Sequence, residues 1–275
     1  MIQKGTLALL SKKKLFSRLT GEHNTVLSGS GMEFKELREY MSGDDVRHIN
    51  PKVTAKTGVP HVNVFHEDKK LNIVIAFLNS GSIYFGGQKS KKETMVEVLM
   101  NICGASLSRQ DMLSVTVYSD ESEFFLKPTR DKKAVLNMLE NVVGMQSLGK
   151  SVDYKGFHEY LFAKIKKKSL IVLVGDFLEF EDFRLLGAKH EVYAAVVRDR
   201  LEEDIKFFGE LNLQDTNSGK SGLFHLDRSS VQEYKKMMQR HDDALFKNFI
   251  QSDIAYEKIY TDDDVVKKLR KLLQN

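Results

Sequence analysis

The sequence predicts an α/β fold in which a doubly wound, mostly parallel sheet is covered by helices on both faces. Two runs, Leu71–Leu78 and Leu170–Val174, are almost entirely apolar, as in strands that are buried on both sides. Between them, Lys89–Leu107 repeats apolar residues at helical spacing. Because strands and helices keep alternating toward the C-terminus, the connections fit crossovers between parallel strands.

The remaining elements after residue 70 follow from the same two periodicities. Further strands are expected at Met112–Tyr118, Glu191–Val197 and Ile254–Tyr260. Further helices are expected at Asp131–Val143, Asp153–Lys167, Glu181–Leu186, Val231–Phe249 and Asp262–Leu273. The segment Phe207–Leu226 holds glycine and asparagine turns between short β-like runs, which is typical of a hairpin.

The first 66 residues differ from the rest of the chain in their sequence pattern. Thr6–Leu19 fits a short helix, and the glycine-rich stretch Gly21–Gly31 fits a loop. Glu33–Met41 fits one or two helical turns, and Val59–Phe65 alternates as a strand does. We therefore expect an N-terminal segment, residues 1–66, followed by an α/β domain at 67–275.

Composition sets limits on the class of protein. The 275 residues are 41% hydrophobic and 29% charged, which is an ordinary globular mixture and argues against global disorder. A single cysteine, Cys103, excludes an internal disulfide framework. Lys12–Lys14 follows the first apolar run instead of preceding it, and no stretch of about 18 apolar residues occurs. A cytoplasmic protein without a membrane span is expected.

Two lysine-rich runs are the densest basic segments in a chain of net charge +4. They are Lys89–Lys92 and Lys164–Lys168. We interpret both as solvated helix ends, because basic and acidic residues are interleaved elsewhere and no concentrated basic face is evident. Nucleic-acid binding through these runs is kept as an alternative function.

Polar residues follow both of the fully apolar strands. Ser80 and Ser82 come after the first strand, and Asp176 comes after the second. The carboxyl ends of parallel strands meet at one edge of a sheet, where ligands of such folds bind. Two hydroxyls and a carboxylate supply oxygen ligands of the kind that magnesium takes. Only one strand-end carboxylate is evident, however, and this weakens the prediction of a magnesium site. The alternative interpretation is that the two serines cap the turn and the following helix.

A second polar cluster lies near the N-terminus. Asp44 and Asp45 are followed closely by Arg47, and Arg38 precedes them. We interpret the two carboxylates as acceptors of hydrogen bonds from the two arginines. These hydrogen bonds would fix a turn. A contact surface for a protein partner is the alternative.

Three segments form a signature near the N-terminus: Glu33–Tyr40, Gly43–Ile49 and Thr54–Gly58. This signature resembles that of a known bacterial family, domain of unknown function 58. The resemblance continues through Phe85-Gly86, Lys127-Pro128, Ser169–Phe177 and Val197–Asp199, and so covers nearly the whole chain after about Gly21. The resemblance implies a von Willebrand factor A-like fold, and members of the family are often encoded beside MoxR-type ATPases of the AAA+ class.

The resemblance also implies where a metal-ion-dependent adhesion site would lie. Ser80 and Ser82 match its two serines, and Asp176 matches its later aspartate. Leu78, however, stands where the first aspartate of the site is found, and Leu78 cannot hold a metal-bound water. Val152 stands where a threonine is expected, with Ser151 one residue away. Another departure is Asn50-Pro51, where the family usually has Asp-Trp.

The function expected from this sequence is that of a non-enzymatic adaptor with a degenerate adhesion site. No cofactor is expected, and magnesium binding is expected to be weak or absent. The expected partner is a protein, with an AAA+ ATPase of the MoxR type implied by the resemblance. Contact candidates are Arg38, Asp44, Asp45, Arg47, Asn79 and Ser151. The alternative from another class is a metal-dependent phosphate-processing or hydrolytic enzyme that uses Asp176.

Overall fold

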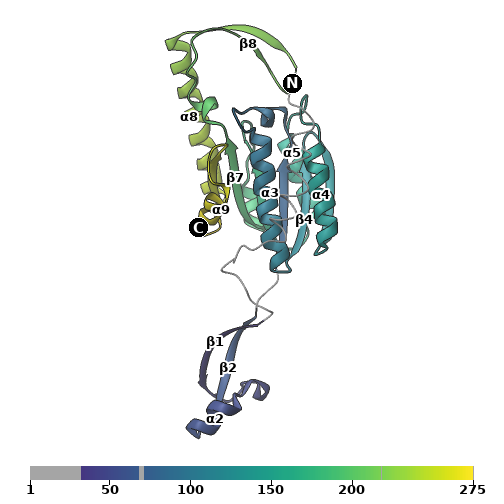
Figure 1. Ribbon diagram of the computed structural model, residues 1–275, viewed down its shortest axis with the longest axis vertical. Helices are drawn as coiled ribbons and strands as arrows, with labels where there is room; N and C mark the ends of the chain where they lie inside the picture. Colours follow the sequence, from purple (N-terminus) through teal and green to yellow (C-terminus); the bar gives the residue numbers. More distant parts are fainter. Residues whose placement is uncertain (1–31, 68–70, 218, 275) are drawn as a thin grey trace. The chain divides into compact units, whose positions relative to one another are not determined.

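The computed structural model describes residues 32–67, 71–217 and 219–274. The chain divides into two compact units, Glu22–Lys70 and a larger one that contains Leu71–Asn275. Figure 1 shows the elements of both units. The helix expected at Thr6–Leu19 and the loop expected at Gly21–Gly31 lie outside the described residues.

The smaller unit is built on an antiparallel pair of strands, β1 (Met32–Glu39) and β2 (His61–Glu67). The helical turn predicted at Glu33–Met41 is therefore wrong, because this segment is a strand. Its charged residues suit a helix surface equally well, but hydrogen bonding across to β2 decides the conformation, with Arg38 opposite Val62. A single shift in register falls between Phe34 and Glu36.

A short helical connection joins these two strands. It consists of the 3-10 turn η1 (Val46–His48) and helix α2 (Pro51–Thr57). Asn50 caps α2 by accepting a hydrogen bond from the Val53 amide at 3.2 Å, and Pro51 occupies the first helical position. Gly58 ends the helix at φ 74°, a left-handed conformation that glycine adopts without strain. The Asn50-Pro51 pair, a departure from the family pattern, is thus a helix start.

The larger unit contains a six-stranded sheet in the order β10-β7-β6-β3-β4-β5. The expected α/β class with a mostly parallel sheet is confirmed, since β5 alone among these six strands runs antiparallel to its neighbour. The strands are β3 (Asn72–Leu78), β4 (Met112–Tyr118), β5 (Ser122–Thr129), β6 (Leu170–Gly175), β7 (Glu191–Arg198) and β10 (Ile254–Tyr260). The strand order reverses between β3 and β6, which are adjacent.

Helices cover both faces of the sheet (Figure 1). On one face lie α3 (Lys91–Ser108), α4 (Lys132–Gly144) and α9 (Val265–Gln274). On the other face lie α5 (Tyr154–Lys164), α6 (Arg184–Lys189) and α8 (Arg228–Gln251). Alternate residues of β3 enter the two cores, so that Phe77 packs under α3 while Leu78 packs on the α5 and α8 side. No helix among the described residues combines the length and low charge that a membrane span needs.

A two-stranded hairpin extends from the end of the larger unit that carries the carboxyl ends of the parallel strands. The short helix α7 (Arg200–Glu203) follows β7, and the chain then forms β8 (Gly209–Gln214) and β9 (Ser221–Leu226) before α8 begins. In Figure 1 the hairpin reaches from the top of α8 across the upper end of the unit. The expected hairpin within Phe207–Leu226 is thus present.

Candidate functional site

The strand-end residues singled out in the sequence meet at the carboxyl edge of the sheet. Ser80 precedes the 3-10 turn η2 (Gly81–Tyr84), which follows β3, and Asp176 follows β6 directly. These two strands flank the reversal of strand order, where ligands bind in doubly wound sheets. The Ser80 and Ser82 hydroxyl oxygens are 2.8 Å apart, and the Ser82 hydroxyl donates to Asp176 Oδ2 at 2.5 Å.

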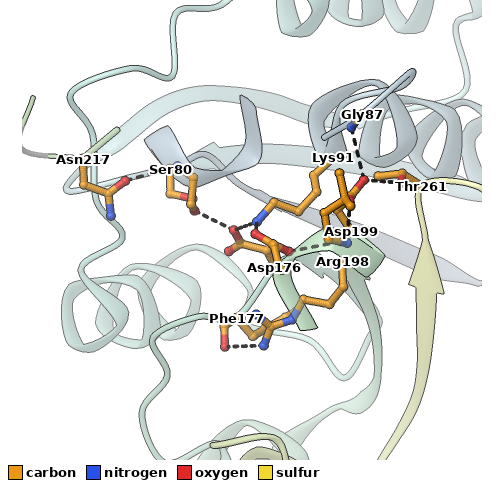
Figure 2. A network of polar contacts seen from close by, with 12 residues as sticks. Ser80, Gly87, Lys91, Asp176, Phe177, Arg198, Asp199, Asn217 and Thr261 are labelled. Atoms are coloured by element: carbon orange, nitrogen blue, oxygen red, sulfur yellow. Dashed lines mark hydrogen bonds and ion pairs between the residues drawn. The ribbon is translucent and has the colours of Figure 1, made fainter. Parts of the chain in front are cut away.

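A lysine ammonium lies at the centre of this cluster. Lys91, the first residue of α3, is fully buried and donates from Nζ to Asp176 Oδ2 at 2.8 Å. The same nitrogen donates to Glu202 Oε1 at 2.5 Å, so one ammonium joins carboxylates that follow β6 and β7. Figure 2 shows Lys91 reaching toward Asp176 between the strand-end loops. Buried lysines require such partners, because an unpaired ammonium loses its hydration without compensation.

The two carboxylates paired with Lys91 differ in the direction of their pKa shifts. Burial acts to raise the pKa of Asp176, but Lys91, the Ser82 hydroxyl and the nearby Arg198 together hold that pKa below its ordinary value. Burial raises the pKa of Glu202 above its ordinary value, and the attraction of Lys91 offsets only part of this effect. Asp176 is therefore the ionised partner of the ammonium, and Glu202 is the more easily protonated one.

A second buried cation lies beside the cluster. Arg198, the last residue of β7, is fully buried and donates from Nη2 to Asp242 Oδ1 at 3.2 Å and to the Phe177 carbonyl at 3.4 Å. Its Nε and Nη1 have no hydrogen-bond partner among the described residues. The next residue, Asp199, accepts from the Thr261 hydroxyl at 2.6 Å and caps α7 (Figure 2). The edge is thus built from charges that are paired within the fold.

The donor set at this edge does not fit a divalent cation. Leu78, at the position of the first aspartate of an adhesion site, is buried in the core, and its side chain lies against Gly175. The remaining carboxylate, Asp176, already accepts from Ser82 and Lys91 at the same oxygen. A divalent ion here would be repelled by the ammonium at short range in a buried environment. Within the described part of the chain, no three His, Cys, Asp or Glu residues are grouped so as to hold a metal.

The other strand-end candidates differ in exposure. Asn79 is buried, and its amide nitrogen donates to Glu123 Oε1 at 2.7 Å and to the Gln146 carbonyl at 3.2 Å. It therefore joins loops inside the unit and is not offered to a partner. Ser151 is exposed on the loop before α5, next to Lys150, whose carbonyl accepts from the Gly81 amide at 2.9 Å. Ser151 thus lies on the accessible rim of the same edge.

The candidates of the N-terminal cluster form ion pairs within the smaller unit. Arg38 binds Asp44 through two hydrogen bonds of 2.8 Å, and the Asp44 carboxylate also accepts from the Met41 amide. Arg47 pairs with Asp45 on an exposed surface. The Arg38 hydrogen bonds hold the pKa of Asp44 below its ordinary value. These contacts fix the turn after β1, and they leave the outer sides of both arginines at the surface.

The interpretation of Lys89–Lys92 as a solvated helix end is wrong for two of its lysines. Lys91 is fully buried in the cluster described above, and Lys92 is 5% exposed. Lys92 donates to the Met145 carbonyl and lies over the Tyr84 ring, while burial lowers its pKa to about 8. Lys89 pairs with Glu97. Two of the three lysines of this run are therefore part of the interior, and Lys89 is held in an ion pair.

Lys91 and Glu202 are the residues of the edge that sequence reasoning missed. A local signal for Lys91 exists, because Ser90 and Glu93 form a capping box that fixes the start of α3 one residue before Lys91. A helix that starts there and follows β3 must begin at the carboxyl edge of the sheet, with Lys91 in its first turn. Glu202 carries a similar signal as the third residue of α7, capped by Asp199.

Comparisons with known proteins agree with the resemblance in the sequence. A sequence profile of the family described as "Protein of unknown function DUF58" matches residues 36–244, well over half of the chain. An uncharacterized protein of Mycobacterium bovis and two of Mycobacterium tuberculosis are each 26% identical over 243 residues. Each of these alignments covers 86% of this chain and 77% of the relative.

Two solved structures align with this chain at low sequence identity. An aerotolerance-related membrane protein from Bacteroides fragilis aligns with a TM-score of 0.49 and 12% identity, over 74% of this chain and 97% of that one. The conserved hypothetical protein BatB from Bacteroides thetaiotaomicron aligns with a TM-score of 0.46 and 12% identity, over 74% and 100% of the two chains.

Proposed function

The chain belongs to the DUF58 family of proteins of unknown function, and from this premise we propose that it is a non-enzymatic adaptor that binds a protein partner without a metal ion. The proposed contact is the carboxyl edge of the sheet, where Ser151 is exposed on the rim. The larger unit would be a von Willebrand factor A-like domain, as the order of its strands and helices suggests.

The pairing of Lys91 with Asp176 is the observation that carries this proposal. A general base needs a free lone pair aimed at its substrate, and a metal ligand needs one aimed at the ion. One oxygen of Asp176, Oδ2, accepts from both Lys91 and Ser82, at 2.8 and 2.5 Å. This carboxylate therefore serves to hold strand-end loops together, which suits a rigid contact surface better than a reacting group.

The proposed partner is an AAA+ ATPase of the MoxR type. The support for this class of partner is the family resemblance, and the exposed loops at the carboxyl edge of the sheet support that edge as the proposed site of contact. A surface fixed by buried charge pairs changes little between the free and bound states, so we expect docking without rearrangement of β3, β6 or β7.

The first experiment is a pull-down of the tagged full chain from its native lysate, run in parallel with magnesium and with EDTA. A purified MoxR-type ATPase, kept nucleotide-free so that it needs no metal itself, serves as the defined partner. Equal retention in both buffers is the expected result. Loss of the partner in EDTA would contradict the metal-independent contact.

A matched pair of surface variants locates the contact. Ser151→Arg adds bulk at the proposed edge, whereas Gln251→Arg adds the same bulk at the exposed C-terminal end of α8, near the start of β10 and hence at the opposite edge of the sheet. We expect Ser151→Arg to weaken retention by about fivefold or more, because a long charged side chain on the rim would obstruct the contact, and Gln251→Arg to leave it unchanged. Equal effects of the two variants would remove the strand-end edge from the proposal.

A further inference from the structure

The β8–β9 hairpin crosses the candidate edge of the sheet (Figure 1). Among the described residues, its strands form a separate two-stranded sheet and pair only with each other. Leu213, Leu223 and Phe224 are exposed in it. A hairpin of this kind has little stability by itself in water, so what fixes its position must be sought at its ends.

The tip of this hairpin rests on two of the strand-end loops. The side-chain oxygen Oδ1 of Asn217 accepts from the Ser82 amide at 3.2 Å. The carbonyl of the neighbouring Thr216 accepts from the Gly149 amide at 2.8 Å, in the loop between α4 and α5. Figure 2 shows Asn217 approaching the Ser80 loop from the side away from Lys91. Two backbone donors at the candidate edge are thus satisfied by an insertion that lies more than a hundred residues from Ser82 in the sequence.

The close approach of the tip depends on the absence of a side chain at Gly81. A Cβ atom at this position would lie 2.1 Å from the Thr216 carbonyl oxygen, far inside van der Waals contact. The loop after β3 therefore has a glycine where another chain segment lies directly on its backbone. A hairpin that passed over the edge without touching it would not require a glycine at this position.

The tip is also organised by its own hydrogen bonds. Asp215 accepts from the Asn217 amide at 2.9 Å, and the Asp215 carbonyl accepts from the Gly219 amide at 2.7 Å. These bonds lie within the tip and do not involve the strand-end loops. Movement of the tip away from the edge would break the bonds from Ser82 and Gly149 and the packing at Gly81.

We propose that the hairpin tip is an internal occupant of the partner-binding edge and that a partner loop replaces it. The partner loop would present hydrogen-bond acceptors, carbonyl or carboxylate oxygens, to the amides of Ser82 and Gly149. This inference rests on the proposed function for its biological meaning, but the occupancy of the edge can be tested without a partner.

The first test is amide hydrogen exchange on the full chain carrying Asn217→Ala. Removing one net hydrogen bond is expected to speed exchange of the Ser82 amide by about fivefold. Asn212→Ala is the matched control, because Asn212 is an exposed asparagine on β8 and lies outside the contact. Exchange at Ser82 that is unchanged by Asn217→Ala, or changed equally by both variants, would overturn the occupancy of the edge.

The second test measures competition with the defined partner. In one variant a short Gly-Ser linker replaces residues 209–226, whose ends are adjacent because Gly209 pairs with Leu226. If the hairpin blocks the edge, the purified nucleotide-free ATPase binds this variant and Asn217→Ala more tightly than the wild-type chain, by about fivefold or more for the full replacement. Unchanged or weaker binding would overturn the blocking role.

The outcomes separate this inference from the proposed function. Faster exchange at Ser82 with no binding by any variant would leave the hairpin contact standing and would count against the adaptor. Binding that Ser151→Arg weakens, but that hairpin removal does not strengthen, would support the adaptor and overturn the internal occupant.

Discussion

The two units of this protein use ion pairs in opposite environments. In the larger unit, Lys91 is fully buried between Asp176 and Glu202 at the edge of the sheet. In the smaller unit, Arg38 pairs with Asp44 at a partly exposed turn, and Arg47 pairs with Asp45 at the surface. Water screens the second kind of pair and is absent from the first, so similar geometry has different energetic consequences. The contrast indicates where charge is structural and where it is available for contact.

The largest effect is expected from breaking the buried pair. Lys91→Met leaves two buried carboxylates without their cation, and it should lower the free energy of unfolding by about 3–5 kcal/mol. Chemical denaturation of the purified chain measures this. Adding Asp176→Asn and Glu202→Gln should recover part of the loss, because no uncompensated charge then remains. A loss below about 1 kcal/mol for Lys91→Met would mean that the ammonium is not essential to the edge.

The next effect is the creation of a metal site. Leu78→Asp together with Lys91→Ser restores a carboxylate after β3 and removes the ammonium. We expect manganese, followed by electron paramagnetic resonance, to bind this double variant at least about tenfold more tightly than the wild-type chain. Leu78→Asn with Lys91→Ser is the control, since it has the same shape but lacks the charge. Tight stoichiometric binding of manganese by the wild-type chain would contradict the conclusion that the donor set at this edge does not fit a divalent cation.

A pH profile distinguishes the two carboxylates that share Lys91. The folded-state pKa of Asp176 is below its ordinary value of 3.8, so its stabilising effect is complete above pH 3.8 and is lost as the pH falls through the folded pKa. The folded-state pKa of Glu202 is above 4.5, so its contribution is complete below pH 4.5 and is lost as the pH rises through the folded pKa.

Unfolding free energies of two variants, measured across this range, test these opposite signs. Asp176→Asn should flatten the acid limb of the stability profile, whereas Glu202→Gln should remove the decline on the other side. Identical profiles for the two variants would show that the carboxylates do not differ as described.

The smallest effect is expected at the exposed pairs. Arg47→Ala should leave the unfolding midpoint of the chain unchanged within error, with or without about 1 M salt, because solvent already screens this charge. Arg38→Ala should lower the midpoint only slightly, because its partner Asp44 keeps the hydrogen bond from the Met41 amide. Of the two, Arg38→Ala should have the larger effect, because its two hydrogen bonds to Asp44 hold the turn after β1. The same variants should reduce partner retention only if the smaller unit contributes to the contact. A clear fall in thermal stability for Arg47→Ala would show that this surface pair is structural after all.

Long apolar runs made most of the larger unit predictable. β4 and β10 have the residue bounds that alternation predicts, because burial on a sheet face leaves a strong signal in each residue. The strand β5 was missed, since it is at the edge of the sheet and its residues are half-buried or exposed. In β1, pairing with β2 overrides a pattern of charges that a helix could equally have carried.

The site was predictable only in part, for a related reason. Chain order and strand ends were enough to bring Ser80, Ser82 and Asp176 to one edge. The burial of Lys91 was not evident, because a lysine in a basic run has the same composition whether it is solvated or paired in the interior. Asn217 comes from an insertion whose contact with Ser82 is set by the path of the hairpin, and no local pattern encodes that path.

A positive charge that belongs to a side chain differs from the charge of a metal ion that is bound from solution. Lys91 cannot be chelated, exchanged for another ion or depleted when cellular magnesium or calcium changes, because it is covalently part of α3. An edge built on it keeps its charge in every ionic environment that leaves the fold intact. Under the proposed function, control over when this edge is open would therefore come from the movement of chain segments such as the β8–β9 hairpin.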